Sequence, residues 1–245
     1  MTTQIKRPAD TYSPLYFLAS LGAGGLAVTF FMYLMFWVPH QGKPVPTFED
    51  ISTAFQTGGF AMQAAIAVAV LGIAVMAFLN LKYLFWNLSS YKAFKQSNGY
   101  DALKNSNAES TLMAMPLALA MSVNAMFIVG LIYVPGLWSI IEYLFPLAMI
   151  AFALIAWLAF KIIGDFLGRI LSQGGIFDVT ANNSFAQLLP AFALSMVAVG
   201  FSAPAAMSQN TTTVGISLVL STFVGTAAVI YALVAIVTAF NSMLH

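Results

Sequence analysis

The chain has 245 residues, of which 60% are apolar and 7% are charged, with a formal net charge of +1. Soluble domains carry roughly 25% charged residues, so most of this chain is expected to lie in lipid. The sequence contains no cysteine, which excludes disulfides, thiolate catalysis and cysteine-ligated metals. The nearly neutral charge gives no argument for nucleic acid as a partner.

Six apolar runs are long enough to cross a bilayer, which takes about 20 helical residues. No cleavage signal precedes the first run, so it is interpreted as a true span rather than a signal peptide. Residues 1–245 are therefore predicted to form a single all-α transmembrane domain. Its predicted spans are residues 15–38, 60–86, 111–133, 139–163, 186–205 and 213–243.

The connection over residues 88–110 has two interpretations. Leu88, Tyr91 and Phe94 recur at helical spacing beside lysines, which is typical of a short helix lying on the membrane interface. A solvated loop with a few anchoring aromatic residues fits the same pattern.

Basic residues predict the orientation of the spans. Only Lys43 falls in a connection on one side, whereas the other eight basic residues fall on the opposite side. Because positive charge accumulates in cytoplasmic loops, the N-terminus is predicted to be cytoplasmic, in an integral plasma (inner) membrane protein. The eight residues are Lys6, Arg7, Lys82, Lys92, Lys95, Lys104, Lys161 and Arg169.

Three twelve-residue segments in the odd-numbered spans can be aligned without gaps. They are Ser20–Phe31, Pro116–Phe127 and Pro190–Phe201. Each begins near the cytoplasmic end of its span and ends in phenylalanine, and we interpret the two prolines as helix kinks. Such a parallel repeat predicts helical hairpins around a central pore, with odd spans inside and even spans facing lipid.

Within their predicted bounds, the odd-numbered spans contain no Asp, Glu, Lys, Arg or His. Ionisable residues within spans usually mark ion pathways and proton relays. Glu142, Lys82 and Lys161 lie near span ends, where they can reach an interface. The sequence has no intramembrane histidine pair, carboxylate pair or metal-ligand cluster. We therefore expect no enzyme activity, no cofactor and no metal.

An uncharged pore can still pass anions through hydroxyls, amides and backbone N–H groups. The repeat places Leu21, Leu117 and Ala191 at one level, just after the first residue of each segment, and Gly25, Met121 and Ser195 one helical turn further on. Asn124 has a competing interpretation as an interhelical hydrogen-bonding residue, and the glycines Gly22, Gly24 and Gly25 have one as close-packing sites. The candidate pore residues are Leu21, Gly22, Gly25, Pro116, Leu117, Met121, Asn124, Pro190, Ala191 and Ser195.

Several motifs resemble the family of tellurite-resistance permeases (TehA-like), slow-type anion channels and dicarboxylate (malic acid) transporters. They are Tyr16-Phe17, the run Gly22–Gly25, Met115-Pro116-Leu117, Gly174-Gly175-Ile176-Phe177, Ser184-Phe185 and Leu189-Pro190-Ala191. The resemblance implies five hairpins around a pore, a homotrimer, and a blocking phenylalanine in the ninth helix. Since only three hairpins are present, the chain is expected to be incomplete at its C-terminus, with the gate residue outside it.

The function predicted from these features is a passive channel for small inorganic anions in the lipid bilayer. One alternative is a proton-linked exporter of an oxyanion or C4-dicarboxylate, such as sulfite, malate or a tellurite-related ion. A further alternative is a non-transporting membrane partner subunit.

Overall fold

The computed structural model describes residues 8–173 and 185–243, which are built from helices. The motif residues Gly174-Gly175-Ile176-Phe177 and Ser184, and the basic residues Lys6 and Arg7, lie outside these ranges. The long helices are α1 (Phe17–Trp37), α3 (Phe60–Phe94), α5 (Ala114–Tyr133), α6 (Ile141–Gln173), α7 (Leu189–Met207) and α8 (Thr211–Met243). The short ones are α2 (Phe48–Thr57) and α4 (Asn98–Lys104).

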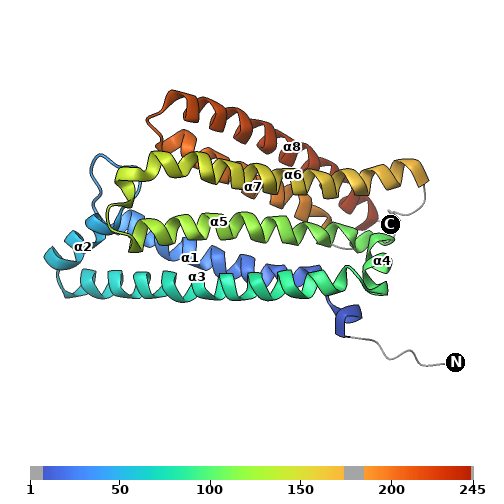
Figure 1. Cartoon of the computed structure of the whole chain (residues 1–245), viewed down its shortest axis with the longest axis horizontal. Coiled ribbons are helices and arrows are strands. Elements are labelled where there is room, and N and C mark those ends of the chain that lie inside the picture. Colours follow the sequence, from blue (N-terminus) through green and yellow to red (C-terminus); the bar gives the residue numbers. More distant parts are fainter. Residues whose placement is uncertain (1–7, 174–184, 244–245) are drawn as a thin grey trace.

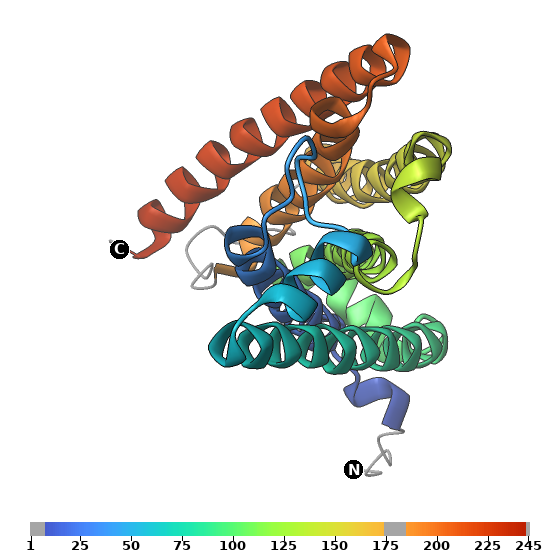
Figure 2. The same ribbon diagram turned by 90° about the vertical axis from the view of Figure 1, so that its left-hand side faces the viewer.

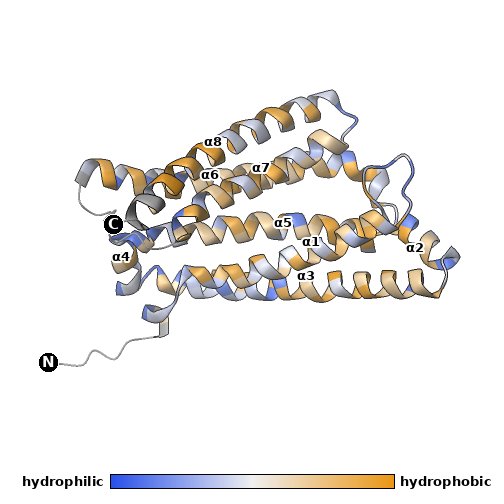
Figure 3. Ribbon diagram, turned by 180° about the vertical axis from the view of Figure 1, so that it is seen from behind, coloured by the Kyte–Doolittle hydropathy of each residue, from blue (hydrophilic) through white to orange (hydrophobic). Residues whose placement is uncertain are grey.

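The prediction of an all-α membrane protein is confirmed, because six helical segments are long and apolar enough to span a bilayer. The long helices run side by side, with α2 at one end of the bundle and α4 at the other (Figure 1). We call these the α2 end and the α4 end. Hydrophilic residues gather near the two ends, whereas the middle of the bundle is mostly apolar (Figure 3). The six segments are Pro14–Trp37, Phe60–Phe94, Asn107–Tyr133, Leu137–Ser172, Phe185–Met207 and Thr211–Ala239.

Neither interpretation of the 88–110 connection is correct over its first part, because α3 continues unbroken to Phe94. Tyr91 and Phe94 are buried and pack with Tyr12 and Leu112 instead of lying on a membrane surface. This packing favours continuation of the helix past the apolar run. Helix α4 and a 3₁₀ helix, η3 (Asn107–Met113), then lead into α5.

The odd-numbered spans form a central row. Helix α5 contacts α1 on one side and α7 on the other, while α3 packs on α1 and α5, and α6 and α8 pack on α7 (Figure 2). The span that contains α5 is the most buried, with 61% of an apolar 18-residue stretch buried inside the structure. The span formed by α8 is the least buried, with 17% of such a stretch. Burial on several sides explains why the surface of α5 is apolar all round.

Each odd-numbered span starts with a 3₁₀ turn at the α4 end. These turns are η2 (Pro14–Tyr16), η3 and η5 (Phe185–Leu188). Pro116 and Pro190 fall in the first turns of α5 and α7, where a proline removes no intrahelical α-type hydrogen bond. They begin these helices, so their interpretation as kinks is corrected. The prolines that lie beyond the first turn of a described α-helix are Pro146 of α6 and Pro204 of α7.

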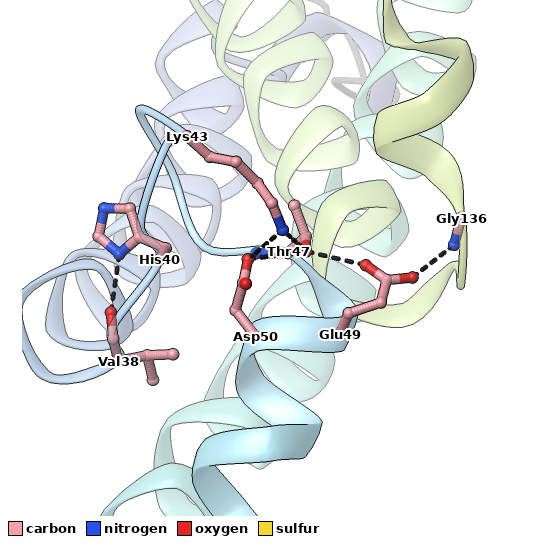
Figure 4. Close-up of polar contacts among 7 residues, drawn as sticks. All are labelled: Val38, His40, Lys43, Thr47, Glu49, Asp50 and Gly136. Atoms are coloured by element: carbon pink, nitrogen blue, oxygen red, sulfur yellow. Dashed lines mark hydrogen bonds and ion pairs between the residues drawn. The ribbon is translucent and has the colours of Figure 1, made fainter.

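A polar clamp joins the first connection to the third at the α2 end (Figure 4). Lys43 Nζ donates to Asp50 Oδ2 at 2.7 Å, and the Thr47 N–H donates to the same oxygen at 2.9 Å. Burial raises the pKa of Asp50, but these bonds outweigh it and leave that pKa below its ordinary value. Glu49 accepts a 2.7 Å bond from the Gly136 N–H, which is the largest cause lowering the pKa of Glu49.

Candidate functional site

The candidate pore residues occupy three kinds of position rather than one common surface. Those on α5 and at the start of α7 are mostly buried, namely Pro116, Leu117, Met121, Pro190 and Ala191. Leu21, Gly25 and Asn124 are half-buried, and Gly22 and Ser195 are exposed.

The three glycines of α1 differ in what surrounds them. A methyl group at Gly24 would lie 2.6 Å from Met121 Cγ and 2.8 Å from Asn80 Nδ2, so Gly24 allows α1 to approach α3 and α5 closely. A methyl group at Gly22 or Gly25 would meet no heavy atom within 4 Å among the described residues. The close-packing interpretation therefore holds for Gly24, and Met121 belongs to that contact.

A cavity of about 290 Å³ lies between the helices α5, α6 and α7. Asn124 lines it and also donates through Nδ2 to Met196 Sδ at 3.6 Å, so this side chain both reaches a cavity and bonds to a neighbouring helix. Pro204, inside α7, lines the same cavity; its missing N–H cannot bond the carbonyl of Gly200, four residues earlier. The lining residues are Val123, Asn124, Met126, Phe127, Leu144, Phe145, Leu147, Ala148, Ala151, Phe152, Gly200, Ala203 and Pro204.

The polar contacts that α3 makes with α1 and with the residues just before α1 were not predicted from the sequence. Asn80 and Asn87 are fully buried on α3. Asn80 bonds Ser20, whereas Asn87 accepts from the Tyr12 hydroxyl at 2.8 Å and donates to the Tyr16 carbonyl at 3.1 Å. The two asparagines are seven residues apart on one helix face, and this spacing within an apolar run is the signal that could have revealed them.

One ionisable group lies at the start of an odd-numbered span. Glu109, on η3, is 1% exposed and forms an ion pair with Arg169 of α6. The prediction that the odd spans carry no ionisable residue thus fails for the third span, whose helical segment begins at Asn107. Because η3 extends the third span at its N-terminal end, Glu109 falls within the helical segment of that span.

Other charged groups have local structural partners. Glu142 accepts hydrogen bonds of 2.6 Å from the Ser208 hydroxyl and the Gln209 N–H, which ties α6 to the connection between α7 and α8. Within residues 8–173 and 185–243, no group of three His, Asp or Glu side chains could hold a metal ion. Asn124 is the polar side chain in the lining of the cavity between α5, α6 and α7, whose other lining residues are apolar.

No family model, curated protein or solved structure matches this chain. Its class therefore follows from architecture. Six apolar helices of spanning length make it an integral membrane protein with the general build of a transporter or channel.

Proposed function

We propose that this protein is a passive channel for small inorganic anions, related to the tellurite-resistance permeases and slow-type anion channels. The supporting observation is that α1 and α7, which flank α5 in the central row, leave small and uncharged residues uncovered. Gly22 is exposed on α1, and Ser195 is exposed on α7. Gly25 lies three residues after Gly22, and nothing packs where its side chain would be. We call the face of α1 around Gly22 and Gly25, and the face of α7 around Ser195, the two open stripes.

Hydroxyls near these stripes fit a weak anion site. The Thr29 hydroxyl donates to the Gly25 carbonyl at 3.0 Å, and the Ser202 hydroxyl donates to the Val199 carbonyl at 2.8 Å. An anion must compete with these bonds, so it binds weakly and leaves quickly. Fast release suits conduction better than tight binding.

The α4 end is assigned to the cytoplasm in this proposal. Six described basic residues lie toward that end, and Lys43 lies in the connection at the α2 end. Positive charge in short loops favours the cytoplasmic side. By the same family resemblance, the working channel is a homotrimer. The six residues are Lys82, Lys92, Lys95, Lys104, Lys161 and Arg169.

Cysteine accessibility tests the proposed conduit, because the 245 residues contain no cysteine to give background reaction. Protein carrying G22C, G25C or S195C is reconstituted in liposomes, and anion current is measured before and after a charged, water-soluble thiol reagent. We expect an anion current that the reagent blocks at these three positions. The control V229C lies on α8, where Val229 is 60% exposed and faces lipid in this proposal, and should not react.

Absence of anion current from the wild-type protein would overturn the channel proposal. If the cysteines of G22C, G25C and S195C were as unreactive toward the reagent as that of V229C, the stripes would face lipid instead. Either result counts against the assigned conduit.

Glu109 gives specific support to a second candidate, a proton-linked exporter of an oxyanion or C4-dicarboxylate. Buried carboxylates within spans are common in proton relays, and Glu109 lies at the entrance to α5. This candidate predicts a saturable, pH-dependent flux that the double variant E109M/R169M, which removes the carboxylate together with its ion-pair partner, abolishes. A passive channel predicts a flux that needs no titrating group at position 109.

A further inference from the structure

A second, smaller cavity lies at the α4 end, away from the residues assigned to the conduit. Its volume is about 100 Å³. The ends of α3 and α6, together with α4 and η3, surround it. Its lining residues are Tyr91, Lys95, Tyr100, Lys104, Glu109, Leu112, Met115, Leu158, Lys161, Ile162 and Asp165.

The cavity carries an excess of positive charge. Three lysines line it, and of the two carboxylates Glu109 is already paired with Arg169. Asp165 lies 3.9 Å from Lys161, with both side chains about half exposed, so this pair is weak. The described residues place no carboxylate within ion-pair distance of Lys95 or Lys104.

Aromatic rings hold these two ammonium groups near the cavity. Lys95 Nζ lies 5.6 Å from the centre of the Tyr91 ring, and Lys104 Nζ lies 5.6 Å from that of Tyr100. Tyr91 is buried, which restricts the ring on which Lys95 rests. A cation on a ring keeps its N–H donors available, so both lysines can donate to an incoming anion.

The floor of the cavity is apolar, which distinguishes a lipid from a free ion. Leu112, Met115, Leu158 and Ile162 line it. Residues 154, 158 and 162 share one face of α6, and Leu154 is 63% exposed. This face leads from the charged cavity toward the middle of the apolar span, which is the direction an acyl chain takes from its headgroup.

We propose that this cavity binds the phosphate of an anionic phospholipid, with Lys95, Lys104 and Lys161 around the headgroup and an acyl chain along Leu158 and Leu154. Basic pockets between transmembrane helices are known to select acidic headgroups. The bound lipid bridges α3, α4 and α6 at the α4 end. This lipid site is separate from the proposed conduit, and lipid binding there does not depend on anion conduction.

The test measures lipid binding to purified protein in detergent by native mass spectrometry and by thermal stabilisation. The probes are phosphatidylglycerol, phosphatidylcholine and inorganic phosphate. The variant K95Q/K104Q removes two cavity lysines, and K82Q/K92Q removes two exposed lysines of α3 that do not line the cavity. At about 1 kcal/mol for each lysine, the first variant should weaken phosphatidylglycerol binding on the order of 30-fold.

The expected result is preference of the wild-type protein for phosphatidylglycerol over phosphatidylcholine, lost in K95Q/K104Q and retained in K82Q/K92Q. Equal binding of the two lipids by wild-type protein would overturn the proposal without any variant. An equal loss in both variants would show general surface attraction and would also overturn it. Binding of inorganic phosphate with no lipid preference would identify a free-anion site instead of a lipid site.

Discussion

Ser20, in the first turn of α1, and Asn80 of α3 bond to each other reciprocally. The Ser20 hydroxyl donates to the Asn80 carbonyl at 2.9 Å, and Asn80 Nδ2 donates to the Ser20 carbonyl at 2.8 Å. Both residues are fully buried. Each helix thus supplies one side-chain donor and one backbone acceptor, which fixes the axial position of α1 against α3.

Replacing Asn80 by alanine should destabilise the protein by about 1–3 kcal/mol. Hydrogen bonds between membrane helices average about 0.6 kcal/mol and reach about 1.7, and loss of the buried side chain adds a cavity cost. Unfolding in mixed detergent micelles measures the change. The control Asn98→Ala removes an exposed asparagine of α4 and should stay within about 0.5 kcal/mol of wild type. Equal stability of the two variants would contradict the structural role of Asn80.

Replacing Gly200 by alanine should overpack the contact between α7 and α6. The added methyl group would lie 2.2 Å from ring atoms of Phe152, which is 3% exposed and packs beside Phe201. Overpacking of this kind costs about 1–3 kcal/mol. Thermal unfolding in detergent should show the loss, and the double variant G200A/F152L should recover much of it.

Gly22→Ala is the matched control for that change, since a methyl group there meets no described atom within 4 Å. It should leave the unfolding temperature unchanged or slightly raised, because alanine favours a helix more than glycine does. A drop as large as that of Gly200→Ala would show that an unseen partner covers Gly22.

Acid should weaken the clamp at the α2 end. The pKa values of Asp50 and Glu49 are lowered in the folded protein, so the unfolded chain takes up protons first as pH falls. Their stabilisation is therefore complete above the unfolded pKa values of about 4 and is lost as pH falls through the folded values. Unfolding temperatures measured from pH 7 to pH 3 should fall steeply at the acid end.

Asp50→Asn should lower the unfolding temperature at pH 7 and flatten that acid dependence. Asp101→Asn, which removes an exposed carboxylate of α4, should keep the wild-type profile. If the Asp50 variant followed the wild-type curve in parallel, acid sensitivity would have to arise elsewhere.

Removing one partner of the ion pair between Glu109 and Arg169 should destabilise the protein strongly, whereas replacing both partners should destabilise it little. Glu109→Gln alone leaves a largely buried guanidinium without its counter-ion, and such changes cost about 3–5 kcal/mol. The double variant E109M/R169M removes both charges and should recover most of that loss. The comparison pair K161M/D165M, which is half exposed, should change stability by less than about 1 kcal/mol.

Composition and hydropathy were sufficient to predict the six spans, because lipid permits long apolar helices and little else. Helix ends were harder to predict. Tyr91 and Phe94 are aromatic beside lysines, a pattern typical of an interface, yet their burial against Tyr12 extends α3. These contacts join residues about eighty positions apart, so no local pattern reveals them.

The candidate pore residues illustrate a similar limit. A twelve-residue alignment assigns Gly25, Met121 and Ser195 to equivalent levels, but it cannot show which way each side chain points. In the structure Met121 fills the space beside Gly24, whereas Ser195 is exposed. Helix rotation is set by tertiary packing, so the conduit assignment stays a prediction until accessibility is measured.

The unequal packing within the three consecutive helix pairs has a consequence for biosynthesis. Helix α1 packs extensively on α3, and α7 on α8, whereas α5 packs more on α1 and α7 than on α6. The polar bonds of the first pair involve no residue beyond Asn87, so they are available before α5 is synthesised. The first and third hairpins can thus close as they emerge, whereas α5 completes its packing only after both α1 and α7 are present.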